Sequence, residues 1–117
     1  MDFFKRAQQE PFRWGQNDCA LWVASYVYEQ TGVDPAKILR GRYKTALGCH
    51  RLLKKEGGLL AVSKRLMSEF KLGEDIGVFE LNGVEIAGIQ KGDFTAFKTP
   101  HGLYLEKEAR LICGWSI

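Results

Sequence analysis

The segment Trp14–Tyr28 constrains this chain most, because a turn in it delivers a cysteine to the start of an apolar helix. Trp14-Gly15-Gln16-Asn17 predicts the turn, since glycine and asparagine tolerate the backbone angles of a sharp reversal. Asn17 or Asp18 then caps the helix by accepting a hydrogen bond from its first turn. The residues that follow are apolar around most of the helix, which predicts a largely buried element.

Cys19 would lie where the first-turn N–H groups and the helix dipole stabilise a thiolate. Such a position lowers the pKa of a thiol below its free value of about 8.5 and makes it a better nucleophile. Free cysteine is also among the commonest buried small apolar residues. The surroundings of Cys19 therefore decide between a catalytic and a structural role.

Four motifs carry a family resemblance: Trp14-Gly15-x-x-Asp18-Cys19, Thr31-Gly32-x-Asp34-Pro35, Arg40-Gly41-x-Tyr43 and Gly114-Trp115-Ser116-Ile117. The first resembles the nucleophile segment of NlpC-type papain-fold cysteine peptidases, which cleave cell-wall peptides of bacteria. Together, over nearly the whole chain, the motifs are similar to a small set of phage and prophage proteins that resemble cut-down relatives of that fold. The resemblance implies Cys19 as nucleophile and a peptidoglycan peptide or phage tail proteins as partners.

The composition predicts one globular domain over residues 1–117, with 45% hydrophobic and 26% charged residues. A net charge of +3, evenly spread, argues against a nucleic-acid partner. Three cysteines without metal-ligand spacing indicate a reducing compartment and no metal or cofactor. No apolar run reaches the ~18 residues of a membrane span. We therefore expect a cytoplasmic protein, or one incorporated in a phage particle, without membrane contact.

The chain divides into a helical half and a strand-rich half. Helices are predicted over Phe3–Gln9, Cys19–Gln30, Ala46–Glu56 and Leu59–Phe70, with a short one at Asp34-Pro35, and strands over Ile76–Glu80, Val84–Ile89, Phe94–Phe97, Leu103–Glu106 and Leu111–Ile117. This order predicts an α+β fold, with the nucleophile helix packed on an antiparallel β-meander. The resemblance implies that this fold is papain-like and of NlpC type.

A nucleophilic thiol needs a base, and the family resemblance offers two strand registers for finding one. One register uses Gly92-Asp93 and His101-Gly102 as strand starts. It brings the histidine one residue too close to the glycine, and such a slip turns a side chain to the other face. The preferred register uses Asp75–Glu80 and Val84–Ile89. It puts Ile86 where the family has its catalytic histidine.

The chain has two histidines. His50, beside Cys49 in a predicted helix, is interpreted as a surface residue, and Cys49 and Cys113 as structural. His101 lies in the turn between the third and fourth strands, which a meander brings to the cysteine edge of the sheet. It is either a simple turn residue or the missing imidazole, with Thr99 or Glu106 to orient it.

Two main functional hypotheses follow. In a thiol hydrolase, Cys19 attacks an amide carbonyl, His101 acts as base and then acid, and helix-start N–H groups stabilise the oxyanion. Trp14 and Asp18, beside the thiol, are the candidate substrate-binding residues. The alternative is a non-catalytic papain-fold module that binds or assembles, plausibly in a phage tail, and Ile86 favours it. An acyltransferase using the same thiol is a third, weaker hypothesis.

Overall fold

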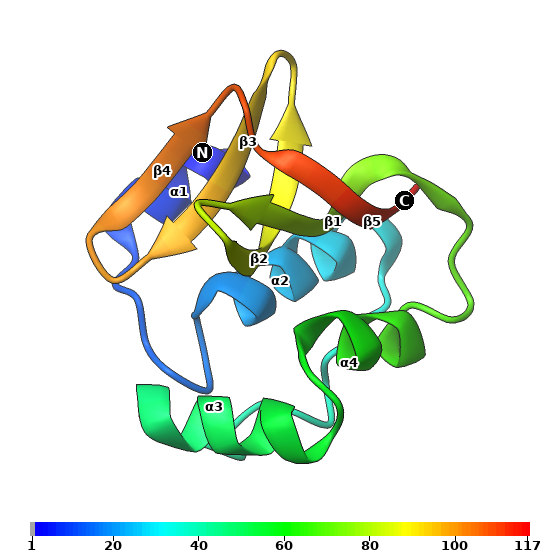
Figure 1. Cartoon of the computed structure of the whole chain (residues 1–117). Coiled ribbons are helices and arrows are strands. Elements are labelled where there is room, and N and C mark those ends of the chain that lie inside the picture. The colour runs from blue at the N-terminus through cyan, green and yellow to red at the C-terminus, as the bar shows by residue number, and fades with distance from the viewer. Residues whose placement is uncertain (1) are drawn as a thin grey trace.

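The computed structural model describes residues 2–117, in which four helices and a five-stranded antiparallel sheet form an α+β fold (Figure 1). The helices are α1 (Phe3–Gln9), α2 (Cys19–Thr31), α3 (Ala46–Lys55) and α4 (Leu59–Leu66). The strands are β1 (Leu72–Leu81), β2 (Val84–Lys91), β3 (Phe94–Thr99), β4 (Gly102–Glu106) and β5 (Arg110–Trp115). The α+β prediction is confirmed, and the two strands on which the preferred register depends are present as β1 and β2.

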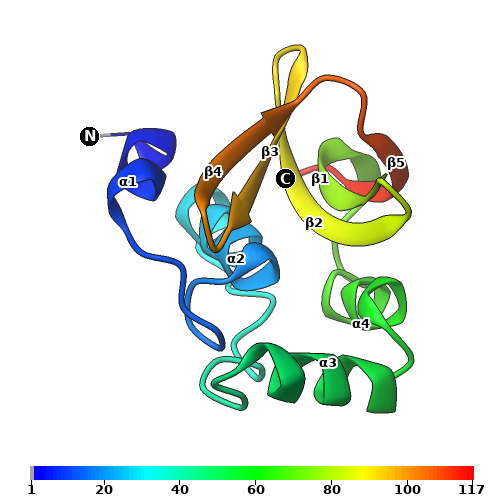
Figure 2. The ribbon, with the colours of Figure 1, turned by 60° about the vertical axis from the view of Figure 1, so that its left-hand side comes forward.

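α2 is the helix that packs on the sheet, mainly against β2 and β3, while α1 contacts β4. α3 and α4 lie beyond the first turns of α2, away from the β3–β4 hairpin, and α4 also contacts β1 and β2 (Figures 1 and 2). α2 ends at Gly32, which is left-handed (φ 80°) and donates its N–H to the Tyr28 carbonyl oxygen at 2.8 Å. This is the glycine cap that the sequence predicts.

The sheet has the order β4-β3-β2-β1-β5, so the predicted meander is right for four strands and wrong for the fifth. After β4 the chain crosses the end of the sheet, and β5 pairs antiparallel with β1 on the far side (Figure 1). Glycines allow this pairing. Gly77 faces Gly114 across the strands, and a Cβ on either would lie 2.5 Å from a backbone oxygen. The Gly114 of the closing motif is therefore a packing requirement.

Two helix predictions need correction. The short helix at Asp34-Pro35 is instead a run of turns over residues 35–41, because Leu39 N donates to the Ala36 carbonyl oxygen at 2.9 Å and Arg42 N to that of Leu39 at 3.1 Å, which are turn bonds between residues three apart. α4 ends at Leu66, four residues early. The chain there tightens into turns, with Phe70 N donating to the Met67 carbonyl oxygen at 2.9 Å.

The core consists of two clusters of buried side chains. The first joins α1, α2 and the sheet: Ala7, Trp22, Val23, Val27, Met67, Ile76, Ala87, Ile89, Ala96 and Trp115. The second joins α2, the loop after it and α4: Leu21, Ala24, Ala36, Leu39, Tyr43 and Val62. α2 contributes to both, so it is the centre of the fold.

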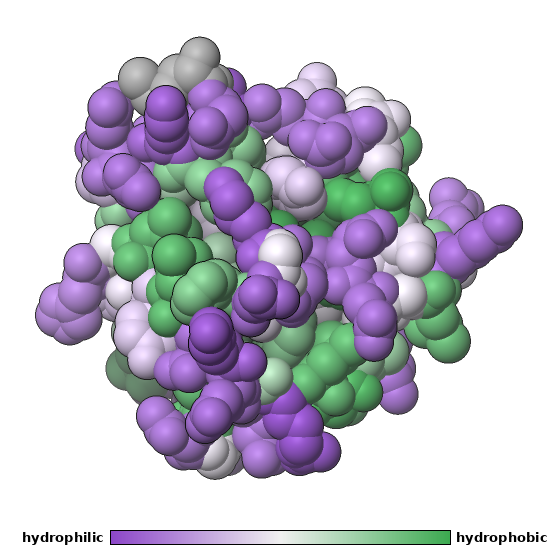
Figure 3. All heavy atoms as spheres, turned by 90° about the horizontal axis from the view of Figure 1, so that it is seen from above, coloured by the Kyte–Doolittle hydropathy of each residue, from purple (hydrophilic) through white to green (hydrophobic). Residues whose placement is uncertain are grey.

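The surface is mixed in character. On the face seen in Figure 3, hydrophilic and hydrophobic side chains are interspersed. Over residues 2–117, no helix combines the length and the apolar character needed to cross a membrane.

Candidate functional site

The turn before α2 is built around a buried carboxylate. Asp18 is the N-cap of α2 and is only 1% exposed. Its Oδ1 accepts from Leu21 N at 3.0 Å, and its Oδ2 accepts from Gly15 N at 3.0 Å and from the Tyr43 hydroxyl at 2.6 Å. Of the two predicted caps, Asp18 is thus the one used. Both carboxylate oxygens are bonded within the protein, so a substrate-binding role for Asp18 stays a prediction.

Arg40 connects the loop after α2 to the turn that precedes α2. Its guanidinium forms a two-pronged ion pair with Asp34, at 2.7 and 3.2 Å. It also donates to the Gln16 carbonyl oxygen at 3.2 Å and to Ser25 Oγ at 3.2 Å. The motif residues Asp34 and Arg40 therefore hold the turn in place.

We expect Arg40→Ala to lower the free energy of unfolding by about 2 kcal/mol, because it leaves the Asp34 carboxylate and two acceptors near α2 without their donor. Urea denaturation followed by tryptophan fluorescence measures the loss. Arg42→Ala is the matched control, since Arg42 is exposed, and we expect a change within about 0.5 kcal/mol. Equal losses in both variants would contradict the role of the Arg40 clamp.

Cys19 is the first residue of α2, and its thiol lies against β2. Burial, and next the nearby Asp18 carboxylate, raises the pKa of the Cys19 thiol to about 12, although backbone hydrogen bonds from Ala87 and Ala20 act in the opposite direction. The sequence predicts a lowered pKa, and that prediction is wrong. Desolvation outweighs the helix dipole here, because the thiol faces packed apolar side chains and a second negative charge.

The residue on β2 that faces this thiol is Ala87. Ile86, which the resemblance to NlpC-type peptidases would put at their histidine position, pairs with Phe79 of β1, on the opposite face of the sheet. Ala87 lines the cavity beside Cys19. β2 thus lies beside the thiol. Because side chains alternate along a strand, Ala87 and not Ile86 faces Cys19, and alanine also lacks a titratable group.

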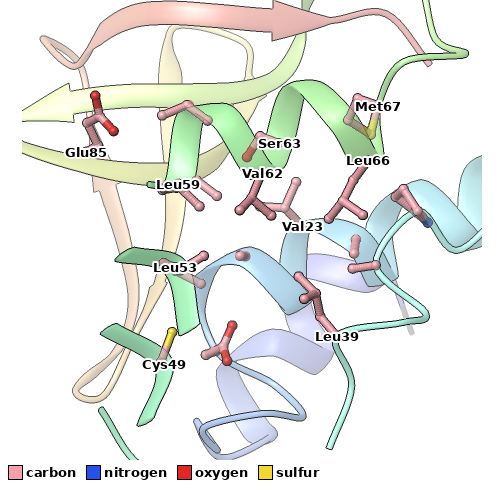
Figure 4. A pocket seen from close by; sticks show the side chains of 18 of the residues that line it. Val23, Leu39, Cys49, Leu53, Leu59, Val62, Ser63, Leu66, Met67 and Glu85 are labelled. Atoms are coloured by element: carbon pink, nitrogen blue, oxygen red, sulfur yellow. The ribbon is translucent and has the colours of Figure 1, made fainter. Parts of the chain in front are cut away.

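A cavity of about 450 Å³ adjoins Cys19 and separates the two core clusters. Its walls come from α2, α3, α4, the loop after α2, β1 and β2. In Figure 4, Leu59, Val62 and Leu66 of α4 lie across from Val23 and Leu39, with Cys49 and Leu53 of α3 at one end. The size and the mostly apolar lining are those of a small-molecule site.

The cavity reaches the surface beside α3 and the start of β2. Ala46, His50, Val84 and Glu85 line it and are exposed; we call these four residues the mouth. Cys19, Trp14 and Asp18 line the same cavity. Trp14 packs edge-on against Phe12, with ring centroids 4.8 Å apart, and its substrate-binding role stays a prediction.

Residues 1–117 match the family described as a domain of unknown function, DUF6950. The chain belongs to this family. No curated protein and no solved structure matches it. The DUF6950 domain therefore contains the turn before α2, the Arg40 hydrogen bonds and the cavity.

His101 does not line the cavity of the DUF6950 chain. It is exposed in the β3–β4 turn, and its backbone N–H donates to Thr99 Oγ1 at 3.2 Å. The two predicted orienting groups are bonded elsewhere: Thr99 Oγ1 donates to the Gly102 carbonyl oxygen at 2.9 Å, and Glu106 accepts from the Tyr104 hydroxyl at 2.8 Å. The geometry fits the turn-residue interpretation of His101.

Lys98 occupies the end of β3 that faces the helices. It is 1% exposed, and its ammonium donates to the carbonyl oxygens of Ala7 and Glu10. Burial lowers the pKa of this ammonium. Lys98 thus fixes the end of α1 to the sheet. At this end of β3, the side chain directed towards α1 is therefore a lysine and not a histidine.

Sequence reasoning missed the side chains that α3 turns towards Cys19. Ala46, Cys49, His50 and Leu53 follow the spacing i, i+3, i+4, i+7 and all line the cavity. That spacing is the signal in the sequence that could have found them, whereas the larger Leu47 beside Ala46 is 56% exposed. Burial raises the pKa of the Cys49 thiol. In the part of the chain that the structure describes, these side chains form no three-residue metal cluster.

Proposed function

We propose that this DUF6950 chain is a papain-like domain of NlpC type that acts as a non-catalytic binding module. The support for the fold is a thiol at the start of a helix that packs on an antiparallel sheet, with β2 beside the thiol. The resemblance of the sequence motifs points the same way. The observation that carries the binding role is the apolar cavity of about 450 Å³ next to Cys19.

The chemistry at Cys19 favours binding over hydrolysis. With a pKa raised to about 12, the thiol is protonated near neutral pH, and Ala87 stands where a base on β2 would have to be. Phage tail proteins are the partners that the resemblance implies. A peptidoglycan stem peptide, with its charged groups, suits an apolar cavity poorly.

A thiol hydrolase remains the second candidate, on one specific observation. His50 lines the same cavity as Cys19, from α3. A movement of α3 that brought this imidazole to the sulfur would create the nucleophile–base pair that the mechanism needs. In that case His50, and not His101, is the general base.

The pH dependence of Cys19 alkylation tests the binding proposal. In a Cys49→Ser, Cys113→Ser background, we expect the rate of reaction with iodoacetamide to keep rising beyond pH 10, because the thiol titrates at about 12. Intact-mass spectrometry gives the rate at each pH. An apparent pKa well below 8.5 that rises in His50→Ala, but not in His101→Ala, would overturn the proposal and establish the hydrolase.

Cys19→Ser provides the matching test of function. A binding module should keep its partner or ligand affinity within about twofold, since serine is close to cysteine in size. A hydrolase should lose at least about 10³-fold in turnover, as loss of a nucleophile usually does. Pull-down of phage tail proteins and digestion of purified peptidoglycan are the two assays.

A further inference from the structure

The walls of the cavity follow two helices over the same length. Along α2 the lining residues are Cys19, Ala20, Val23, Ala24 and Val27, and along α4 and its C-cap they are Leu59, Val62, Ser63, Leu66 and Met67. Each stripe covers eight residue steps, which is about 12 Å of helix. The space between them is thus elongated, with the mouth towards the Cys19 end.

The interior offers a ligand almost no polar partner. The Asp18 carboxylate is bonded to Gly15, Leu21 and Tyr43, and among residues 2–117 no buried side-chain nitrogen or oxygen lacks a hydrogen-bond partner. A hydrogen-bonding group placed inside the cavity would lose its water without replacement. The part of the ligand that enters must therefore be apolar.

The residues at the mouth determine which charge the exposed end of the ligand can carry. Of the lining residues in the described chain, none is a lysine or an arginine, while Glu85 is exposed at the start of β2 and His50 is exposed on α3. In Figure 4, Glu85 lies apart from Val62, Leu66 and Met67 of the apolar wall. A carboxylate there repels an anionic head group and attracts a cationic one.

From these three observations we propose that the cavity binds an amphiphile with a single unbranched aliphatic chain and a cationic or neutral head group. The chain lies between α2 and α4, and the head stays at the mouth, next to Glu85. This inference rests on the proposed binding function and specifies its ligand.

The test is calorimetric titration of the full chain with hexylamine, octylamine, decylamine and dodecylamine, each below its micelle concentration, with decanoate as the anionic counterpart. Affinity should rise by about fourfold per methylene while the added carbon enters the cavity, and level off once the chain exceeds it. The affinity for decylamine should exceed that for decanoate by at least about fivefold. Glu85→Gln should remove that preference, and Glu108→Gln, an exposed carboxylate outside the lining residues, should keep it.

A cavity-filling variant locates the binding. Ser63→Leu places a larger side chain between α4 and α2 and should weaken decylamine binding by about tenfold. Ser68→Leu, on an exposed residue outside the lining, is the matched control and should bind normally. Tryptophan fluorescence at increasing urea confirms that both variants fold.

The outcomes separate the two proposals. Affinity that rises without levelling off, or that is equal in Ser63→Leu and Ser68→Leu, would overturn the cavity as the amphiphile site. If the amines fail to bind but neutral indole binds and is blocked by Ser63→Leu, the ligand class is wrong and the binding function stands. If neither amines nor indole bind, the cavity is not a small-molecule site and the amphiphile proposal falls, while the pull-down of phage tail proteins decides the binding function.

Discussion

Asp18→Ala should lower the free energy of unfolding by about 4 kcal/mol, a large part of the 5–15 kcal/mol typical of a domain. The carboxylate is 1% exposed and accepts from Gly15 N, Leu21 N and the Tyr43 hydroxyl. Its removal takes away the N-cap of α2 and leaves three buried donors unpaired, each costing about 1–3 kcal/mol before relaxation. Urea denaturation followed by circular dichroism measures the loss.

Asp2→Ala is the matched control for this prediction. Asp2 caps α1 in the same way but is exposed and accepts from Lys5 N alone, so its loss should cost about 1 kcal/mol. If Asp18→Ala does not fold, Tyr43→Phe removes one of the three donors and should cost about 1 kcal/mol, with the turn retained. A similar small loss in Asp18→Ala and Asp2→Ala would show that the buried network contributes no more than an ordinary cap.

Gly15→Ala is expected to be at least as damaging, about 4 kcal/mol or more, for a different reason. Gly15 has φ +81°, and a Cβ on it would lie 1.9 Å from the Tyr43 carbonyl oxygen. Backbone would have to move, and the movement would pull Gly15 N away from Asp18 Oδ2. The thermal midpoint should fall by well over 10 °C, as measured by differential scanning calorimetry.

Gly32→Ala is the control that separates the cost of the left-handed backbone from the cost of the clash with Tyr43. Gly32 has nearly the same backbone angle, φ +80°, but a Cβ there would have no heavy atom within 4 Å. Its replacement should therefore cost only the left-handed conformation, about 1 kcal/mol. Equal losses in Gly15→Ala and Gly32→Ala would mean that the Tyr43 segment yields easily and that the turn is less rigid than its geometry implies.

The elements of this fold were readable from local patterns. The cap at Asp18, the left-handed Gly32 and the Asn82-Gly83 hairpin each involve a few consecutive residues, and the structure has all three. α1 has the predicted bounds, and β2 begins at the predicted residue. Such features follow from backbone sterics and hydrogen bonds between near neighbours, which a sequence states directly.

The errors have two causes, a long-range strand pairing and local turns that replace a helix. The pairing of β5 with β1 depends on the match of Gly77 with Gly114, which are 37 positions apart in the chain. At the early end of α4 and in the turns over residues 35–41, hydrogen bonds between residues three apart replace those of a helix. Helix propensity resolves neither kind of error, because it contains neither a strand partner far along the chain nor the hydrogen bonds of a particular turn.

For the candidate site, the sequence alone determined that a thiol stands at the start of an apolar helix, next to a capping Asp18. Only the tertiary structure decided the surroundings of that thiol. Packing against Ala87, beside the buried Asp18 carboxylate, raises its pKa, and α3 and α4 enclose an apolar cavity in front of it. A pKa depends on solvent and charge within a few ångströms in space, whereas a sequence records only neighbours along the chain.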